Sequence, residues 1–324
     1  MRLPTRLLLL FACVAATSCG SSAESTAPVT PGTPTTPSTP TPDPRLGTSQ
    51  LNVVYCTAGG VPLRLDVYYP TVAPPAGGRW PLIVYDHGGE LIEGDKGKFP
   101  GSPVEAWVNA LAPRGYVFAS VNYRLGPAFK FPAMIEDAKC AIRYFRANAT
   151  TYNIDPARIG ATGTSSGAYL ATLIGVTDAT AGYEGTGGWP GVSSRVAAVV
   201  SEYGVSDVEA PPFSQLEADG RLLAYPPSPS ADFLRNATAK NHVTADDPPF
   251  YLLHGDHDPF VNPQVSRDLY AKFQAIGVPS QLTMVVNAGH GWPPGAGTQF
   301  GLVNPTWQQI LVSEMAFFDK YLKP

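Results

Sequence analysis

The sequence predicts an α/β fold in which helices cover both faces of a mostly parallel sheet. From Leu51 onward, short apolar runs rich in β-branched residues alternate with segments of helical period. The runs are almost continuously apolar, which is typical of strands buried on both faces. Because no internal repeat is visible, the alternation favours one large layered α/β domain.

A pair of leading strands is expected before a set of central ones. Residues 51–55 and 63–69 should pair antiparallel, with Gly59 and Gly60 in the turn between them. The central strands are predicted at 81–85, 116–121, 159–162, 196–201, 250–253 and 281–286.

Helices are expected between these strands, at 104–111, 134–148, 168–176, 263–276 and 306–321. In the second, Ile135, Ile142 and Phe145 fall on one face while Lys139 and Arg146 face away, so this helix should cover the sheet. The stretch 209–247 is rich in Pro, Ser, Asp and Ala and lacks a strong period. It predicts loops and short helices, a minimal cap at most.

The composition is that of an ordinary globular protein. The chain has 324 residues, of which 44% are apolar and 15% charged, enough to build one large core. The formal net charge is -4, and the Lys and Arg residues are scattered rather than gathered into a run. We therefore expect no nucleic-acid partner.

The N-terminal segment has the order of an export signal. Arg2 and Arg6 precede the apolar residues 7–16, and small residues lead to Cys19. The apolar run is shorter than the roughly 20 residues of a membrane-spanning helix. Residues 16–19 resemble a bacterial lipobox, which predicts a signal peptide over 1–19, a lipid on Cys19 and export from a bacterial cell. Ordinary secretory cleavage is the alternative; contact with a membrane is expected only through the lipid.

Residues 20–47 are dominated by Pro, Thr and Ser and offer little to bury. They predict a disordered, rather extended tether with no partner of its own. One large α/β domain is expected over 48–324.

Cys56 and Cys140 are the cysteines left for that domain. Export permits a disulfide between them, but two free buried thiols fit the sequence equally well. No Cys and His spacing suggests a structural zinc, and no metal or cofactor is expected.

The most specific motif is Gly163-Thr164-Ser165-Ser166-Gly167. It follows the predicted strand 159–162 and opens the predicted helix 168–176, which is the context of a nucleophile elbow. The serine of an elbow lies in a strained turn that tolerates only small neighbours. Ser165 is therefore the candidate nucleophile, and a Gly/Ser turn that caps a helix is the alternative.

A serine nucleophile needs a histidine to accept its proton and a carboxylate to orient that histidine. His290 lies in a loop directly after the last predicted strand, and Asp258 lies between serine and histidine in the chain order expected after an elbow. Asp256 is the competing acid, but its place in the turn suits bonds to backbone N–H groups.

The same segment also contains His254 and His257, and imidazole with carboxylate ligands suits zinc. These residues are nearly consecutive and are not spaced to point at one centre. The pattern favours a catalytic role for Asp258 over a metal site.

Hydrolysis of an ester builds negative charge on the carbonyl oxygen, so backbone N–H donors are needed near the serine. Gly88, Gly89 and Glu90 follow the predicted strand 81–85 in a glycine turn whose amides can point inward. The amide of Ser166, next to the nucleophile, is the other expected donor.

With these segments in place, the chain from about Leu51 resembles the esterase/lipase branch of the α/β-hydrolase superfamily. It looks most similar to carboxylesterases of the acetyl-xylan and feruloyl type. The matching segments are 87–89, 137–143, 153–160, the elbow at Ser165, 246–250 and the loops of Asp258 and His290. The resemblance implies an α/β-hydrolase fold, with Gly89 and the following amide as first oxyanion donors. Glu90 departs from it, since many relatives have a third glycine there, and Ser166 stands where alanine is commoner.

The expected function is therefore hydrolysis of short-chain or carbohydrate-linked carboxylic esters through an acyl-enzyme. The same triad would serve an amidase or peptidase, and an inactive hydrolase scaffold that only binds is the remaining alternative. The substrate is expected to be a small-molecule or polysaccharide-linked ester at an open site. Aromatic residues in the loops could line that site, namely Trp189, Phe213 and Trp292.

Overall fold

The computed structural model of the chain describes residues 43–75, 78–210, 224–292, 297–298 and 301–323. The predicted signal peptide with Cys19, most of the predicted linker, and Phe213 lie outside these residues. Among the helices in the described part, none is long and apolar enough to cross a membrane.

Residues 43–47 fall in the predicted linker, but they are folded onto the domain. The guanidinium of Arg45 pairs with Asp43 at 2.7 Å and donates a hydrogen bond to the carbonyl oxygen of Thr151 at 2.7 Å. These contacts tie residues 43–47 to the domain, which therefore extends beyond the predicted boundary at residue 48.

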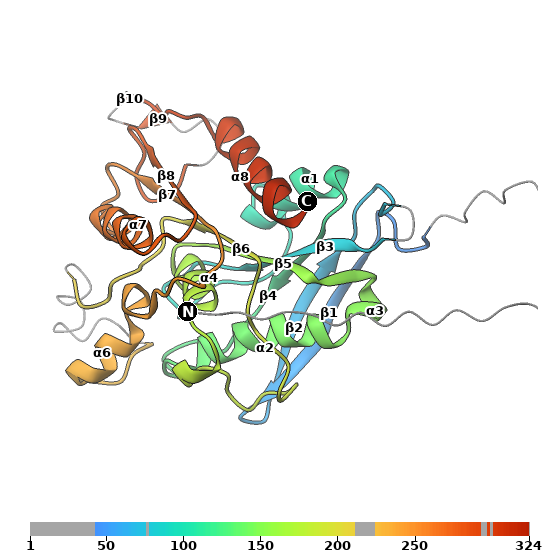
Figure 1. Cartoon of the computed structure of the whole chain (residues 1–324), viewed down its shortest axis with the longest axis horizontal. Helices are drawn as coiled ribbons and strands as arrows, with labels where there is room; N and C mark the ends of the chain where they lie inside the picture. Colours follow the sequence, from blue (N-terminus) through green and yellow to red (C-terminus); the bar gives the residue numbers. More distant parts are fainter. Residues whose placement is uncertain (1–42, 76–77, 211–223, 293–296, 299–300, 324) are drawn as a thin grey trace, which may run out of the picture. The chain divides into compact units, whose positions relative to one another are not determined.

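Eight strands form one sheet in the order β1-β2-β4-β3-β5-β6-β7-β8 (Figure 1). The strand β2 pairs antiparallel with both β1 and β4, and all pairs from β4 to β8 are parallel. This confirms the predicted sheet with its leading hairpin. The bounds are β1 Ser49–Ala58, β2 Val61–Tyr68, β3 Trp80–Asp86, β4 Val117–Val121, β5 Ile154–Thr164, β6 Ala198–Glu202, β7 Phe250–Gly255 and β8 Ser280–Val285.

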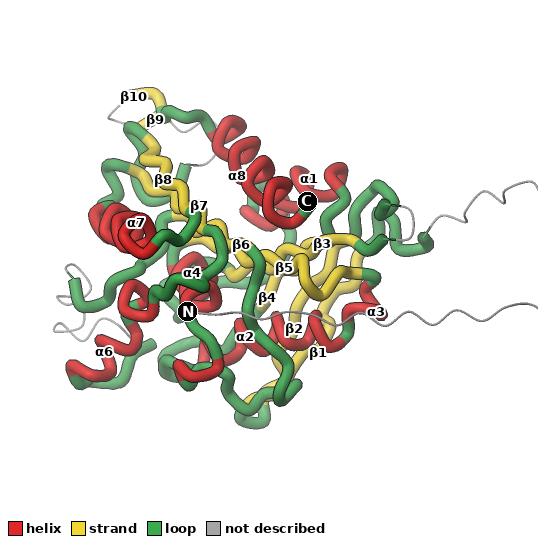
Figure 2. The backbone as a smooth tube through the Cα atoms, viewed as in Figure 1, coloured by secondary structure: helices red, strands yellow, loops and turns green. Residues whose placement is uncertain are grey.

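Helices cover both faces of this sheet, as predicted (Figure 2). The helices α2, α4 and α7 pack on one face, and α1 and α8 pack on the other. The alternation of side chains along a strand makes this possible: Leu82 and Val84 of β3 face the first set, whereas Ile83 and Tyr85 face the second. The bounds are α1 Pro103–Leu111, α2 Ala133–Ala147, α4 Ser166–Val176, α7 Gln264–Ile276 and α8 Trp307–Leu322.

A few elements were not expected. A short helix α3, Ala149–Tyr152, follows α2 and ends at Asn153 in the left-handed conformation. A small hairpin of β9, Gly297–Thr298, and β10, Gly301–Leu302, lies outside the main sheet. The predicted cap region, by contrast, contains short helices as expected, since its described residues form α6, Ala231–Ala237, and a 3-10 turn.

Cys56 of β1 and Cys140 of α2 form a disulfide across 84 positions of sequence. The alternative of two free thiols is thereby excluded. The bond joins the outermost strand of the sheet to a helix that covers it.

Candidate active site

Ser165 lies at the sharp turn between β5 and α4. Its backbone has a φ of +54°, a conformation that residues other than glycine rarely adopt. The amide of Ser165 donates a hydrogen bond to the carbonyl oxygen of Glu202 at 2.9 Å, so the end of β6 helps to hold the turn. The side chain is thereby held above the carboxyl ends of the parallel strands.

The turn is compact because glycine stands on both sides of it. A Cβ atom on Gly167 would lie 2.0 Å from the carbonyl oxygen of Asp86, and one on Gly163 would lie 2.4 Å from the carbonyl carbon of Gly167. Any side chain at either position would push α4 away from β3. The requirement for small residues around the serine thus has a direct steric cause.

His290 links Ser165 to Asp258. Its Nε2 lies 2.9 Å from the Oγ of Ser165, and its Nδ1 lies 2.7 Å from the Oδ2 of Asp258. Because a carboxylate only accepts, Nδ1 carries the proton and Nε2 is free to accept one from the serine. The structure brings all three predicted residues together. The competing acid, Asp256, instead accepts a hydrogen bond at its Oδ1 from the Nδ1 of His257, at 2.7 Å.

The carboxylate of Asp258 is buried and fully engaged. Its Oδ1 accepts hydrogen bonds from the amides of Phe260 at 2.8 Å and Val261 at 3.0 Å. Burial acts to raise the pKa of Asp258, but hydrogen bonds from His254 and His290 and from the Val261 amide outweigh it and hold the pKa well below its usual value. Asp258 is therefore ionised at neutral pH and suited to orient an imidazole.

His254 is a residue of the site that the sequence did not reveal. Its side chain is fully buried, and its Nε2 lies 3.2 Å from Asp258 Oδ2 and 3.1 Å from the carbonyl oxygen of Val261. Both partners are acceptors, so Nε2 carries the proton and Nδ1 accepts from the hydroxyl of Ser266 at 2.7 Å. His254 thus belongs to the support of Asp258. Within the described residues, no group of three or more His, Cys, Asp or Glu side chains is arranged to hold a metal ion.

The glycine turn after β3 runs beside the nucleophile. A Cβ on Gly88 would lie 3.3 Å from the Cβ of Ser165. The amides of Gly89, Glu90 and Ser166 donate to no acceptor in the part of the chain that the structure describes. These amides are therefore available to a substrate oxygen, and their role as oxyanion donors stays a prediction.

Two side chains hold this turn in place. The hydroxyl of Ser166 accepts a hydrogen bond from the amide of Leu91 at 3.3 Å. The phenol of Tyr123 donates to the carbonyl oxygen of His87 at 2.6 Å, and its ring stacks on the imidazole at 4.4 Å. Glu90, which replaces the third glycine of many relatives, has a φ of +55° and an exposed side chain.

Three carboxyl groups are buried behind the elbow, on Asp86, Glu202 and Glu314. Both carboxyl oxygens of Asp86 and Glu314 lack a hydrogen-bond partner among the described residues. Burial raises the pKa of Asp86 and of Glu202 to about 8, and burial with the neighbouring Glu202 raises that of Glu314. Burial therefore favours the uncharged form of these groups, whereas Asp258 is the ionised carboxylate of the site.

Aromatic rings border His290 on two sides. The ring of Tyr203 meets it edge-on at 4.9 Å, and Phe260 meets it edge-on at 5.5 Å. Trp292, a predicted lining residue, is only 3% exposed and packs on Tyr203, so it supports the site from behind. Trp189, the other described candidate, instead donates its indole N–H to the carbonyl oxygen of Tyr55.

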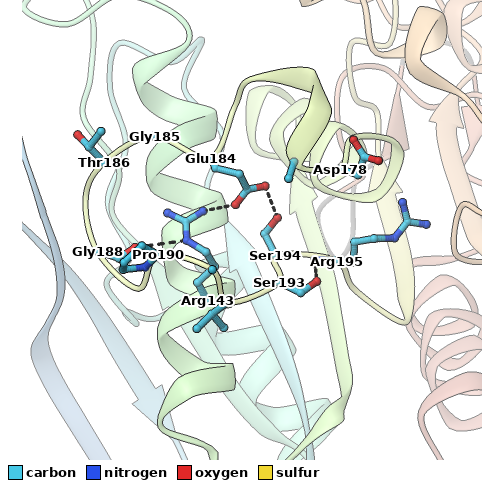
Figure 3. Close-up of a pocket in the computed structure, with 13 residues that line it drawn as sticks. Arg143, Asp178, Glu184, Gly185, Thr186, Gly188, Pro190, Ser193, Ser194 and Arg195 are labelled. Atoms are coloured by element: carbon cyan, nitrogen blue, oxygen red, sulfur yellow. Dashed lines mark hydrogen bonds and ion pairs between the residues drawn. The ribbon is translucent and has the colours of Figure 1, made fainter.

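A separate cavity lies away from the triad, in the loops between α4 and β6 (Figure 3). It measures about 610 Å³, and none of Ser165, Asp258 and His290 lines it. Arg143 and Ser194 both bind the carboxylate of Glu184 within it, at 2.5 and 2.7 Å. The carboxylate of Glu184 is therefore already held by side chains of the cavity itself.

A family model described as BD-FAE matches residues 65–273, which is more than half of the chain. The chain belongs to the BD-FAE family. This membership confirms the resemblance to the esterase branch of the α/β-hydrolases that the sequence motifs indicated.

Among curated proteins, esterase LipQ of Mycobacterium tuberculosis is 29% identical over 256 residues, which are 76% of this chain and 58% of LipQ. The probable carboxylic ester hydrolase LipM of the same organism is 28% identical over 200 residues, or 59% of this chain and 44% of LipM. The chain spans about half the length of the curated relatives it matches.

Solved structures match over a larger share of their length. A truncated carbohydrate esterase from gut microbiota has a TM-score of 0.68 and 27% identity, with 86% of this chain and 98% of that one covered. The butyrate-bound esterase 2 of Thermogutta terrifontis has a TM-score of 0.70 and 25% identity, with 87% and 98% covered. The fold of this BD-FAE member is therefore that of an α/β-hydrolase.

Proposed function

We propose that this BD-FAE member is a serine carboxylesterase that hydrolyses short-chain or carbohydrate-linked esters. The observation that carries the proposal is the chain of hydrogen-bonding distances from Ser165 through His290 to Asp258. A buried, ionised carboxylate, a correctly oriented imidazole and a strained serine are the parts that nucleophilic catalysis requires.

In the proposed reaction, the Oγ of Ser165 attacks the ester carbonyl carbon while its proton passes to Nε2 of His290. The amides of Gly89, Glu90 and Ser166 receive the negative charge that develops on the carbonyl oxygen. When the bond from carbon to the alcohol oxygen breaks, His290 returns the proton to that oxygen. Water then attacks the acyl-enzyme by the same route, and the acid leaves.

The substrate class is supported by the relatives. The gut carbohydrate esterase supports a sugar-linked ester, and the propionate and butyrate found in the Thermogutta esterase support a short acyl chain. Within the described residues, the predicted cap region contributes only α6 and a 3-10 turn, which also favours a short acyl group.

The test uses a fluorophosphonate probe and a matched substrate panel. Wild-type protein should be labelled, whereas Ser165→Ala should show no labelling with an unchanged circular dichroism spectrum, and kcat should fall on the order of 10⁶-fold. Short-chain aryl esters and acetylated sugars should be hydrolysed faster than the corresponding anilides. Faster turnover of the anilides would instead identify an amidase or peptidase, and no labelling of wild type would identify an inactive scaffold.

We further propose that the protein is exported as a lipoprotein with lipid on Cys19. The disulfide between Cys56 and Cys140 supports export, because such bonds persist in oxidising compartments. A Cys19→Ser variant expressed in a bacterial host should leave the membrane fraction while retaining esterase activity. Unchanged membrane association would contradict the lipid and favour ordinary secretion or another anchor.

A further inference from the structure

Phe260 is an exposed apolar side chain at the catalytic centre. Its backbone amide binds Oδ1 of Asp258, which fixes the residue two positions past the catalytic acid. Its ring meets the imidazole of His290 edge-on at 5.5 Å and an interplanar angle of 77°. The side chain nevertheless remains 64% exposed, so most of the ring is open to contact from outside.

Exposure alone does not indicate a binding role, because single apolar side chains are common on protein surfaces. The position of Phe260 relative to the reaction is what distinguishes it. Tyr203 flanks the same imidazole, but its ring is only partly exposed and is also packed against Trp292. Phe260 therefore offers the more open of the two aromatic surfaces beside His290.

The chemistry determines which part of a substrate reaches this ring. His290 must return its proton to the leaving alcohol oxygen, so that oxygen has to lie within hydrogen-bonding distance of Nε2. The acyl carbonyl oxygen is directed to the amides of Gly89, Glu90 and Ser166. The alcohol part of the ester consequently leaves past the imidazole and the rings that border it.

We infer that Phe260 forms the subsite for the alcohol part of the substrate and that this alcohol carries a ring with an apolar face, as a pyranose sugar or a phenol does. This inference rests on the proposed esterase function and specifies its substrate. Such a ring packs its C–H or aryl face against phenylalanine, and a short aliphatic alcohol has no comparable face to offer.

The test compares three acetates that share one acyl-enzyme: ethyl acetate, phenyl acetate and a monoacetylated methyl xylopyranoside. Because the acetyl group is common to all three, differences in kcat/KM report the step in which the alcohol leaves. The variants are Phe260→Ala and Phe260→Trp. The control is Val312→Ala on α8, which removes an exposed apolar side chain of similar exposure, 59%, outside the site.

Phe260→Ala should lower kcat/KM for at least one ring ester about tenfold and for ethyl acetate by less than about twofold. Phe260→Trp should retain most of the activity, and Val312→Ala should match wild type. A loss confined to phenyl acetate would identify an aryl alcohol, and one confined to the xyloside would identify a sugar.

Two results would overturn the inference while leaving the esterase function in place. An equal loss on all three acetates would mean that Phe260 positions Asp258 or His290 without touching the substrate. No loss on any of them would mean that the ring contacts nothing during the reaction. If wild type turned over none of the acetates and matched Ser165→Ala, the proposed esterase function itself would fail, and this inference with it.

Discussion

Nε2 of His254 lies 3.2 Å from Oδ2 of Asp258, the same oxygen that Nδ1 of His290 approaches at 2.7 Å. Two imidazoles therefore share one carboxylate oxygen, one from the strand beneath and one from the loop above. This arrangement limits the rotation of the carboxylate, because its other oxygen is held by two backbone amides.

Replacement of His254 should reduce the reaction rate more than substrate binding. His254→Leu removes the N–H that binds Asp258, and loss of a hydrogen bond to a charged group should lower kcat about tenfold or more with KM little changed. His254→Gln keeps an N–H at a similar reach and should recover most of kcat. Steady-state kinetics on one acetate measures both values. An equal loss in the two variants, matched by equal thermal destabilisation, would indicate only a role in packing.

Gly89 should tolerate no side chain. Its φ is +116°, and a Cβ there would lie 2.2 Å from the carbonyl oxygen of Glu93, so alanine must displace the turn and its amides. Gly89→Ala should lower kcat on the order of 100-fold, the cost of a lost oxyanion donor. Gly60→Ala is the control, because Gly60 also has a positive φ, +78°, but no atom lies within 4 Å of its Cβ position. Near-normal kcat in Gly89→Ala would argue against an oxyanion role for this turn.

The buried carboxyl of Asp86 should make stability fall as pH rises. Burial raises the pKa of Asp86 from 3.8 to about 8, so between these values the unfolded chain has lost a proton that the folded chain keeps. The free energy of unfolding therefore decreases with pH across this window, by at most about 1.4 kcal/mol per pH unit. Asp86→Asn lacks this contribution. Urea unfolding at pH 5 and pH 8 measures the free energy of unfolding of both proteins. The stability of the variant relative to wild type should be higher at pH 8 than at pH 5, and the same pH dependence in both proteins would contradict the prediction.

Removal of the disulfide should destabilise the domain without changing its chemistry. The double variant Cys56→Ser, Cys140→Ser frees a loop of 84 positions and should lose about 2–4 kcal/mol of unfolding free energy. Urea unfolding with and without dithiothreitol measures the effect, and reduced wild type should behave as the variant does. At 25 °C the kcat of the variant should equal that of wild type. A midpoint independent of reductant would show that the bond contributes little.

Much of the fold could be predicted from the sequence, because buried strands and the helices that cover them leave recognisable patterns of apolar and polar residues along the chain. The run 81–85 and the face of Ile142 and Phe145 are examples, and both lie where they were expected. The expectation that Lys139 faces away was wrong, because its side chain is buried and pairs with Glu184 at 2.8 Å. Ser165 was recognisable because an elbow is a local motif. Asp258 and His290 followed from chain order and from their places after strands.

What the sequence did not reveal depends on how loops return in space. His254 ends a strand as an apparently ordinary polar residue, and only the path of the loop at 256–261 brings its ring to Asp258. The contact of Phe260 with His290 arises in the same way. The disulfide could not be predicted, because it depends on the distance between Cys56 and Cys140 in the fold. Their Cα atoms lie 6.5 Å apart. The β9–β10 hairpin is too short to show a period.

The bond between Cys56 and Cys140 also protects the rim of the sheet. β1 is one of the two edge strands of the sheet, and no strand lies on its outer side. The loop at Gly187 and Trp189 binds the amide of Thr57 and the carbonyl oxygen of Tyr55, but Leu51 and Val54 stay exposed. Such a rim is a template on which another chain can add a strand. The cross-link to α2 limits how far β1 can separate from the domain, so we expect it to act as a barrier to strand exchange with a second molecule. A chain held in a reducing compartment would lack that barrier.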